Sequence, residues 1–283
     1  MSTSQVASPA RDARLEASLS VVAGGSAIGR PCYAFRELPS TMDLAHQLAL
    51  QGAAEGTCVW AEQQTAGRGR AGRVWSSPPG GLYCSLILRP SRVLGEVPQL
   101  ALVAGLAVIE AIHDLSKLPL SIRWPNDVLL DGQKLSGILT EAKSGTARRL
   151  HAVVGIGINV TTAPQDLPPG AISLAQRITP APDRLALTGA LFHRFERAYQ
   201  QWNAAGFAAV RHALLPWIGL FGKLVTITTN QHAADSVGRR AQQDLPSQIH
   251  GQALDVDEAG RLVIRLDSGV VRAVDAGEVS LLT

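Results

Sequence analysis

The spacing of apolar and polar residues divides the chain into a long part that mixes helices with strands and a shorter part made of strands. In the long part, apolar residues recur at the spacing of amphipathic helices over 41–51, 99–116 and 184–204. Short apolar runs that are typical of strands cover 33–38, 58–62, 82–88, 121–124, 128–130, 135–140 and 152–160. An Asp131-Gly132 pair lies between two of these runs and predicts a hairpin.

The pattern changes around Pro216–Gly222. Short apolar runs separated by glycine and aspartate then follow, at 224–228, 251–256, 262–266 and 270–274, and they predict a small all-β unit. A polar stretch, Asn230–Gln248, interrupts this unit and is predicted to be a mobile loop. We therefore expect an α+β protein, with a mixed β-sheet and helices over 33–218 and a small β domain over 219–283.

Residues 1–32 are rich in serine, alanine and glycine, and we expect them to form a flexible tail. They contain no long apolar core, so they do not predict a secretory signal. The longest apolar stretch, Leu100–Ile109, is too short for a membrane span and is followed by Glu110. The three cysteines lack the CxxC spacing of zinc and redox sites, which favours a reducing compartment. We predict a cytoplasmic protein that does not associate with a membrane.

The net charge of +3 is small, although the pI is about 9.0. Such a balance suits an enzyme that handles anions such as nucleotide phosphates, but it is too weak to indicate a nucleic-acid partner. The positive charge is concentrated at one place, because Arg68, Arg70 and Arg73 lie within one short segment.

That segment, Gly67–Arg73, alternates glycine with arginine and is called the Gly/Arg loop below. Glycine lets backbone N–H groups approach a ligand closely, and arginine offers a planar cation that suits carboxylates and phosphates. The loop lies between two predicted strands and could close over an anion. An RNA-binding segment and a solvated basic turn are alternatives, although the stretch is single and has no interleaved aromatic residues.

The block Trp124-Pro125-Asn126-Asp127 joins two predicted strands. After the turn, Lys134 returns on the paired strand, close to Asp127. A lysine at this place can act as a point charge on an anionic substrate. An ordinary hairpin with a surface lysine explains the same residues, and taken alone it is the better explanation.

Two further motifs each have two interpretations. Ser40 and Thr41 begin a predicted helix, where they either bind the polar head of a ligand or only cap the helix. Gly155 and Gly157 interrupt an apolar strand, which indicates that a ligand or another element packs closely on the backbone. Asn159 either contacts a ligand or ends the strand. The pattern is not a dinucleotide-binding fingerprint, because it lacks a third glycine and a following helix.

Together and in order, these motifs resemble the catalytic core of the bacterial biotin–protein ligases. The resemblance is strong from Tyr33 to Val160 and includes Lys134-Leu135-Ser136-Gly137-Ile138-Leu139 and Gly155-Ile156-Gly157-Ile158-Asn159. The segment Gly251–Ser280 is similar to the small SH3-like domain that ends these enzymes. The resemblance therefore implies a class II synthetase-like catalytic core that binds biotin and ATP over 33–218, and an SH3-like domain over 219–283.

The resemblance also implies roles for individual residues. Lys134 and Arg70 would be the catalytic residues, with Lys134 on the biotin carboxylate and the α-phosphate. The biotin head and pocket wall would involve Ser40, Thr41, Met42 and Gln64, and the loop over the adenylate would include Gly67, Arg68, Gly69, Arg70, Arg73 and Trp75. The nucleotide site and pocket floor would be formed by Trp124, Asn126, Asp127, Gly137, Gly155, Gly157 and Asn159. The metal ligands and the general base of the transfer step stay unknown, with Asp127 as a guess for the base.

The implied activity is ATP-dependent: biotin is converted to biotinyl-5′-AMP and then transferred to a lysine of a biotin carboxyl carrier protein, an acyl-CoA carboxylase subunit. Biotin and ATP are the expected substrates, Mg²⁺ is expected with ATP, and a homodimer is compatible with the resemblance. Residues 1–32 are too short for the DNA-binding half of some family members, so we expect a ligase of the monofunctional type. Met42 stands where relatives commonly have asparagine.

Two rival functions remain. A lipoate–protein ligase or octanoyl transferase has a similar fold and also uses a lysine near the acyl carboxyl group. The Gly/Arg loop and the C-terminal β domain favour biotin over these acids. A non-catalytic nucleic-acid-binding protein would use the arginines instead, and would show salt-sensitive binding without ATP chemistry.

Overall fold

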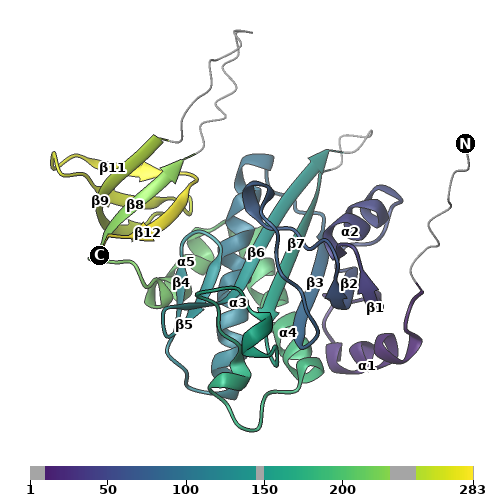
Figure 1. Cartoon of the computed structure of the whole chain (residues 1–283). Coiled ribbons are helices and arrows are strands. Elements are labelled where there is room, and N and C mark those ends of the chain that lie inside the picture. Colours follow the sequence, from purple (N-terminus) through teal and green to yellow (C-terminus); the bar gives the residue numbers. More distant parts are fainter. Residues whose placement is uncertain (1–9, 145–149, 230–246, 283) are drawn as a thin grey trace, which may run out of the picture.

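The structure, a computed structural model, describes residues 10–144, 150–229 and 247–282. It contains a larger mixed sheet covered by helices and a smaller antiparallel sheet formed by the C-terminal part of the chain (Figure 1). The expected α+β class is confirmed. Residues 230–246 of the polar insert lie outside the described residues, while Ser247 and Gln248 already belong to a strand.

The larger sheet has the strand order β1-β2-β3-β7-β6-β5-β4. Its strands are β1 (Cys32–Leu38), β2 (Cys58–Gln64), β3 (Gly81–Leu88), β4 (Leu120–Arg123), β5 (Asp127–Leu130), β6 (Gln133–Ser144) and β7 (Leu150–Asn159). Strands β1 and β2 are parallel and every other described pair in this sheet is antiparallel, so the sheet is mixed as expected. The hairpin expected at Asp131-Gly132 joins β5 to β6.

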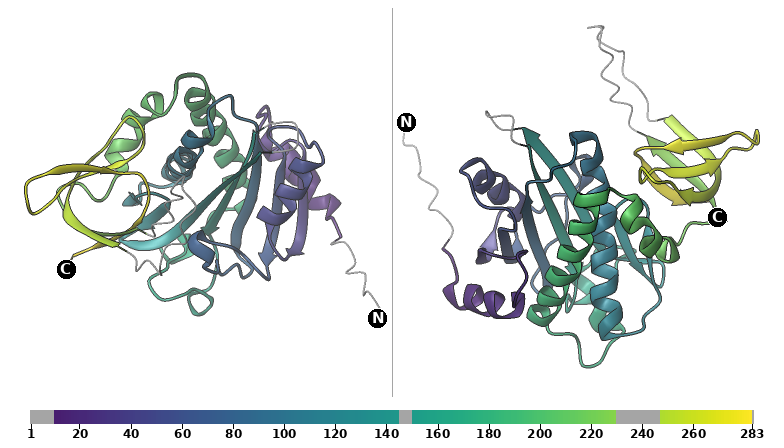
Figure 2. Two further views of the ribbon diagram at one scale, coloured as in Figure 1. Left: turned by 90° about the horizontal axis from the view of Figure 1, so that it is seen from above. Right: turned by 180° about the vertical axis from the view of Figure 1, so that it is seen from behind.

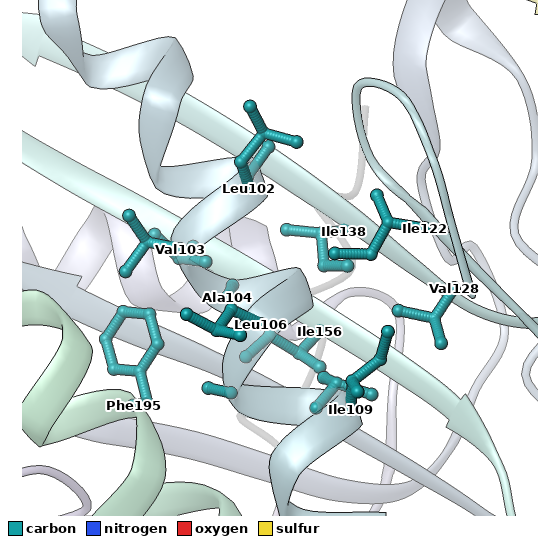
Figure 3. Packing of buried hydrophobic residues seen from close by; sticks show 14 of the residues in the cluster. Leu102, Val103, Ala104, Leu106, Ile109, Ile122, Val128, Ile138, Ile156 and Phe195 are labelled. Atoms are coloured by element: carbon teal, nitrogen blue, oxygen red, sulfur yellow. The ribbon is translucent and has the colours of Figure 1, made fainter. Parts of the chain in front are cut away.

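Two long helices, α3 (Leu100–Leu115) and α4 (Arg184–Ala205), cover one face of this sheet, and α2 (Thr41–Leu50) covers the other (Figures 1 and 2). Helix α3 is apolar nearly all round because it lies between the sheet and α4. Leu106 and Ile109 of α3 pack against Ile138 and Ile156 of β6 and β7 (Figure 3). By length and composition alone the segment 94–115 could cross a membrane, but 78% of its apolar 18-residue window is buried, as in a core helix.

The short helices lie in the connections between these elements. They are η1 (Arg70–Gly72), η2 (Leu94–Gln99), η3 (Pro164–Asp166), η4 (Leu174–Gln176), α5 (Ala208–Leu214) and η5 (Leu215–Trp217). Two of them, η3 and η4, lie in the long connection between β7 and α4.

The N-terminal segment differs from its prediction as a tail up to residue 32. Residues 13–23 form a helix, α1 (Ala13–Ala23), whose N-cap Asp12 accepts hydrogen bonds from the N–H groups of Arg14 and Leu15 at 3.1 Å. Leu19 and Ala23 are fully buried where α1 packs on α4 and β1. The apolar stripe of α1 is narrow and made partly of small residues, so its stability depends on tertiary packing that the local pattern does not reveal.

The smaller sheet has the order β11-β10-β9-β8-β12. Its strands are β8 (Leu224–Thr229), β9 (Ser247–Val256), β10 (Leu262–Arg265), β11 (Val271–Val274) and β12 (Glu278–Leu281). Specific bonds join it to the larger domain: the indole N–H of Trp124 donates to the Gly260 carbonyl at 2.9 Å, and Arg211 forms an ion pair with Asp255 at 2.6 Å. These contacts join the last part of β9 and the turn that follows it to the larger domain.

Candidate active site

A pocket of about 470 Å³ lies between the α2 face of the larger sheet, the Gly/Arg loop and strand β12. Its size is within the range of small-molecule sites. The residues that line it are Thr41, Met42, Gln64, Arg68, Gly69, Arg70, Arg73, Val74, Trp75, Ser76, Cys84, Arg123, Trp124, Pro125, Asn126, Asp127, Lys134, Gly137, Ile138, Leu139, Gly155, Ile156, Gly157, Asn159, Pro168, Ala171, Thr228, Glu278, Val279 and Ser280. Almost all the predicted site residues are therefore brought together.

One end of the pocket is a chain of polar groups at the start of α2. The backbone N–H and the hydroxyl of Thr41 both donate to Oε1 of Gln64, at 2.8 and 3.0 Å. The amide of Gln64 donates to the Ser77 hydroxyl, and the Ser85 hydroxyl donates to Thr41 Oγ1, both at 2.8 Å. This end therefore presents hydrogen-bond donors and acceptors in fixed positions, held by α2 and strands β2 and β3.

The pocket floor, defined here as Gly137 on β6 with Gly155 and Gly157 on β7, is smooth because these residues lack side chains. A Cβ at Gly157 would lie 2.5 Å from Nε1 of Trp75, and one at Gly137 would lie 2.8 Å from Cζ3 of the same ring. Gly137 and Gly157 pair directly across the sheet, so they form a flat seat for the indole. The close packing expected on the β7 glycines is thus confirmed.

Helix α2 explains the third glycine of the floor. A Cβ at Gly155 would lie 2.6 Å from the sulfur of Met42, and the Met42 side chain is only 4% exposed. The thioether therefore fills the space that opens above Gly155. Methionine adapts its shape to such gaps, which suits a pocket wall.

Lys134 lies at the centre of the pocket, on β6. Its ammonium is 2.7 Å from Oδ1 of Asp127 and 5.3 Å from the centroid of the Trp75 ring. The expected proximity of Lys134 to Asp127 is thus confirmed. The other carboxylate oxygen of Asp127 accepts a hydrogen bond from Arg123 at 2.7 Å. Asp127 is thereby fixed between two cations and holds the lysine in place.

The backbone of Lys134 is fixed as well. Its N–H donates to the carbonyl of Gly170 at 2.8 Å, and its carbonyl accepts from the N–H of Ile172 at 3.0 Å. The amide of Asn159 donates to the Ile172 carbonyl at 3.1 Å and to the Lys134 carbonyl at 3.5 Å. Asn159 lines the pocket, and its amide also ties the 168–172 segment to the lysine strand.

Arg70 reaches the pocket from the Gly/Arg loop. Its Nη1 donates to Oδ1 of Asn126 at 3.0 Å and to the carbonyl of Gly277 at 3.4 Å. Both acceptors are neutral, so no carboxylate neutralises the guanidinium directly. Burial lowers the pKa of Arg70. The side chain keeps its charge, because a guanidinium is not deprotonated in proteins. The arginine therefore holds a charge that an anionic ligand would stabilise.

The C-terminal domain completes the pocket. Arg73 forms an ion pair with Glu278, and Thr228, Val279 and Ser280 also line the cavity. The sequence patterns indicated Arg73 but none of these residues of the C-terminal domain, because nothing local marks a short edge strand as part of a distant site. Arg123 was missed as well, although its spacing of four residues from Asp127 places the two side chains together across the β4–β5 turn.

Two predicted site residues lie behind the pocket surface rather than on it. Ser40 is buried and acts as the N-cap of α2, since its hydroxyl accepts from the N–H of Asp43 at 3.4 Å. Gly67 closes the base of the Gly/Arg loop, where its carbonyl accepts from the N–H of Trp75 at 2.9 Å. A Cβ at Gly67 would lie 2.4 Å from the Trp75 carbonyl, so only glycine fits there.

Within the described residues, no group of three or more histidine, cysteine, aspartate or glutamate side chains forms a metal site. The pocket carboxylates, Asp127 and Glu278, are engaged by cations. A magnesium ion often binds through one or two carboxylates together with substrate phosphates. The side-chain oxygens of Asn126 and Asp127 also line the pocket, but both residues are already bound to cationic side chains. Any Mg²⁺ would therefore be held mainly by the nucleotide.

The arrangement suits a reaction between two anions. Lys134 and Arg70 supply positive charge to the pocket. The glycines of the pocket floor allow flat groups to approach the backbone, and the Thr41–Gln64 end can bind the polar head of a ligand. Such a fold and site define an enzyme that activates a carboxylic acid with a nucleotide.

Comparisons with known proteins agree with this class. The profile of the "Biotin/lipoate A/B protein ligase family" matches residues 34–159, and that of the "Biotin protein ligase C terminal domain" matches 246–282. The bifunctional ligase/repressor BirA of Bacillus subtilis is 37% identical over 244 residues, covering 84% of this chain and 70% of the relative. A biotin–[acetyl-CoA-carboxylase] ligase of Mycobacterium tuberculosis is 33% identical, covering 84% of this chain and 83% of the relative.

Solved structures give the same result. The biotin protein ligase of Aquifex aeolicus in complex with biotin and ATP superimposes with a TM-score of 0.72 at 28% identity, covering 89% of this chain and 98% of that protein. The chain belongs to the biotin–protein ligase family.

Proposed function

We propose that the protein is an ATP-dependent biotin–protein ligase that forms biotinyl-5′-AMP and passes the biotinyl group to a lysine of a biotin carboxyl carrier protein. The observation that carries the proposal is one pocket that is lined both by Lys134 and Arg70 and by the Thr41–Gln64 polar end. Acid activation needs cations at the place where a carboxylate meets a phosphate, and recognition of biotin needs hydrogen-bonding groups at the opposite end of a flat apolar cavity.

In the first step, a carboxylate oxygen of biotin attacks the α-phosphorus of ATP, and the bond to the bridging oxygen breaks so that pyrophosphate leaves. Two anions must approach one another, and Lys134 and Arg70 reduce their repulsion and stabilise the charge on the transferring group. Asp127 keeps the lysine at the reaction centre. Binding both substrates in one cavity replaces a bimolecular encounter by an oriented one.

In the second step, the neutral amine of a carrier lysine attacks the acyl carbon of the mixed anhydride, an amide bond forms, and AMP leaves with the bonding electron pair. The amine must lose a proton, and Asp127 stays a hypothesis as its acceptor. The anhydride is prone to hydrolysis, so a loop that covers it is useful. The Gly/Arg loop and β12 are placed to exclude water from it.

The alternative acids are not favoured. The larger family includes lipoate enzymes, but the match of residues 246–282 to the C-terminal domain of biotin protein ligases and the named relatives favour biotin. Biotin also has a polar ureido head, which suits the hydrogen-bonding end at Thr41 and Gln64. Lipoate and octanoate have no comparable polar head.

A biotin carboxyl carrier protein is the proposed protein partner. Two relatives support it, since they are named as biotin–[acetyl-CoA-carboxylase] ligases. The proposal has four further parts. The protein assembles as a homodimer, is located in the cytoplasm, uses Mg²⁺ together with ATP, and has no nucleic-acid or membrane partner. Sedimentation of the purified protein, with and without biotin and ATP, would test the dimer.

The proposed function is tested by incubating the protein with ATP and a carrier domain, in parallel with biotin, lipoate and octanoate. We expect biotin to be attached to one carrier lysine with release of AMP, and little transfer of the other acids. Transfer of lipoate in place of biotin would support the rival ligase, and nucleic-acid binding without AMP release would support the non-catalytic alternative.

A further inference from the structure

A row of ionisable side chains connects α2 to Arg68 of the Gly/Arg loop, and of this row only Arg68 lines the pocket described above. His46 on α2 is 3% exposed, and its Nε2 lies 2.8 Å from Oε2 of Glu141 on β6. Its Nδ1 lies 3.4 Å from Nε2 of His151, a buried residue on β7. A helix and two strands therefore meet at one buried imidazole.

Glu141 connects this imidazole to the loop. Arg68 binds both of its oxygens, with Nη1 2.7 Å from Oε1 and Nη2 3.1 Å from Oε2. Arg68 also lies 2.9 Å from Oδ1 of Asp43, whose side chain is 63% exposed. Of its two carboxylate partners, Glu141 is the more buried and binds with two hydrogen bonds, so it is the stronger anchor.

The loop depends on Arg68 for its position. Arg68 forms an isolated β-bridge with Val74, and the N–H of Gly69 donates to the Arg73 carbonyl at 2.7 Å, so the loop is a small hairpin closed by its own backbone bonds. Arg70, which contacts Asn126 and the C-terminal domain, is part of that hairpin. Fixing Arg68 therefore fixes the arginine that faces the pocket.

The direction of the hydrogen bonds follows from burial. Burial lowers the pKa of His46, although Glu141 opposes the shift, so the ring is neutral around pH 7. A neutral ring that donates from Nε2 to a carboxylate carries no proton on Nδ1, which must then accept from the Nε2–H of His151. Glu141 receives a fixed donor on one side and Arg68 on the other.

We propose that His46 is a positioning residue of the ligase reaction: it holds Glu141, and through it Arg68, so that the Gly/Arg loop keeps the activated acid enclosed. The chemical consequence, retention of the activated acid, rests on the proposed function. The position of the loop does not, and it can be measured even if that function is wrong. His151 supports His46 from behind, and Asp43 contributes little.

The test compares His46→Leu, which removes the donor, with His46→Gln, whose amide can donate to Glu141 from a similar place. Trypsin cleaves after arginine, so the rate of cleavage at Arg68, Arg70 and Arg73 reports how often the loop opens. We expect His46→Leu to raise cleavage in the loop about tenfold, as for loss of a hydrogen bond to a charged group. His46→Gln should stay within about twofold of the original rate.

The chemical readout is labelling of bystander lysines by escaped biotinyl-5′-AMP. We expect this labelling to rise about tenfold in His46→Leu, as in the cleavage test. The kcat for carrier biotinylation should fall, and the KM for ATP should change less than kcat does. His113→Leu is the matched control, because His113 packs on Trp217 on the α3 side of the sheet and should leave loop cleavage and labelling unchanged. Asp43→Asn should have little effect.

If His46→Leu does not fold, Glu141→Gln alone keeps the proposal testable and should reproduce the loop cleavage. If His46→Leu does fold, adding it to Glu141→Gln should not increase the effect further. A folded His46→Leu protein with unchanged loop cleavage and unchanged bystander labelling would overturn the proposal. Increased cleavage at all sites alike would also overturn it, by showing a general loss of stability. Failure of the unmodified protein to form any biotinyl-5′-AMP would instead overturn the proposed function.

Discussion

The pocket floor and the Gly/Arg loop are built by different kinds of interaction. The floor belongs to a sheet backed by α3, in which Ile138, Ile156 and their neighbours are fully packed. The loop is held by charged and polar groups: Arg68 by carboxylates, Arg70 by Asn126, and Arg73 by Glu278. The floor therefore has the rigidity that positions Lys134, while the loop depends on a few ion pairs and hydrogen bonds, as suits a segment that opens and closes over a ligand.

The largest expected effect comes from the catalytic lysine on the floor. Lys134→Ala should lower the rate of biotin-dependent pyrophosphate release by at least about 10²-fold, because it removes a cation from the reacting anions. Circular dichroism should show an intact fold, since the ammonium is partly exposed. Lys143→Ala is the matched control on the same strand, where the side chain is exposed, and should have normal activity. Normal pyrophosphate release by Lys134→Ala would remove this residue from the mechanism.

The next effect concerns the shape of the floor. Gly157→Ala places a methyl group 2.5 Å from Nε1 of Trp75 and must displace the ring. Overpacking of this kind costs about 1–3 kcal/mol, so we expect a lower melting temperature and a KM for ATP raised about tenfold or more. Gly25→Ala, at an exposed position where an added Cβ contacts nothing within 4 Å, is the control. Unchanged kinetics in Gly157→Ala would show that the position of Trp75 is unimportant.

A third prediction concerns retention by the loop. Arg70→Gly should still form biotinyl-5′-AMP, because Lys134 remains, but the product should escape about tenfold faster, the effect expected for loss of hydrogen bonds to a charged group. Biotin would then appear on bystander lysines, which mass spectrometry can detect. Strict carrier specificity in this variant would contradict the closing role of the loop.

A smaller effect is expected at the exposed ion pair between the loop and β12. Arg73 and Glu278 are both more than half exposed, so solvent and salt weaken their attraction. Arg73→Ala should change kcat/KM by no more than about threefold, in line with the small contribution of surface pairs. The effect should shrink further when the ionic strength is raised. A loss as large as that of Lys134→Ala would place Arg73 in the chemistry.

The smallest effect is a dependence of stability on pH. Burial lowers the pKa of His46 and of His151 below the value of 6.5 for a free histidine. Below pH 6.5 the unfolded chain therefore binds more protons at these two histidines than the folded protein does. The stability that the neutral rings provide is complete above pH 6.5 and decreases as the pH falls below it. His46→Gln should flatten this decrease in urea titrations between pH 7 and 5. An unaltered slope would show that His46 is not responsible.

The comparison also explains what could be predicted from the sequence. The strands, the long helices and the hairpin at Asp131-Gly132 follow from periodicity and turn chemistry, because the floor is packed by local patterns of apolar residues. The order of the motifs indicated Lys134 and Gln64 as partners in one site. The close approach of Trp75 to Gly137 and Gly157 could not be predicted, because it depends on how the loop folds back over the sheet.

Three features depended mainly on tertiary contacts. Helix α1 is stabilised by burial of Leu19 and Ala23 against α4 and β1, and the contribution of β12 to the pocket arises from domain packing. The link from His46 through Glu141 to Arg68 joins residues up to 95 positions apart, at ordinary sequence positions on a helix and a strand. Without an obvious motif, only the geometry reveals such a link.

The most direct test of the account is a single-turnover experiment in which the protein is mixed with biotin and ATP, separated from unbound small molecules, and then offered the carrier domain. We expect biotinyl-5′-AMP to stay with the protein and the carrier to convert it to biotinylated lysine and AMP. Carrier biotinylation without any bound biotinyl-5′-AMP, or adenylate formed from lipoate but not from biotin, would contradict it.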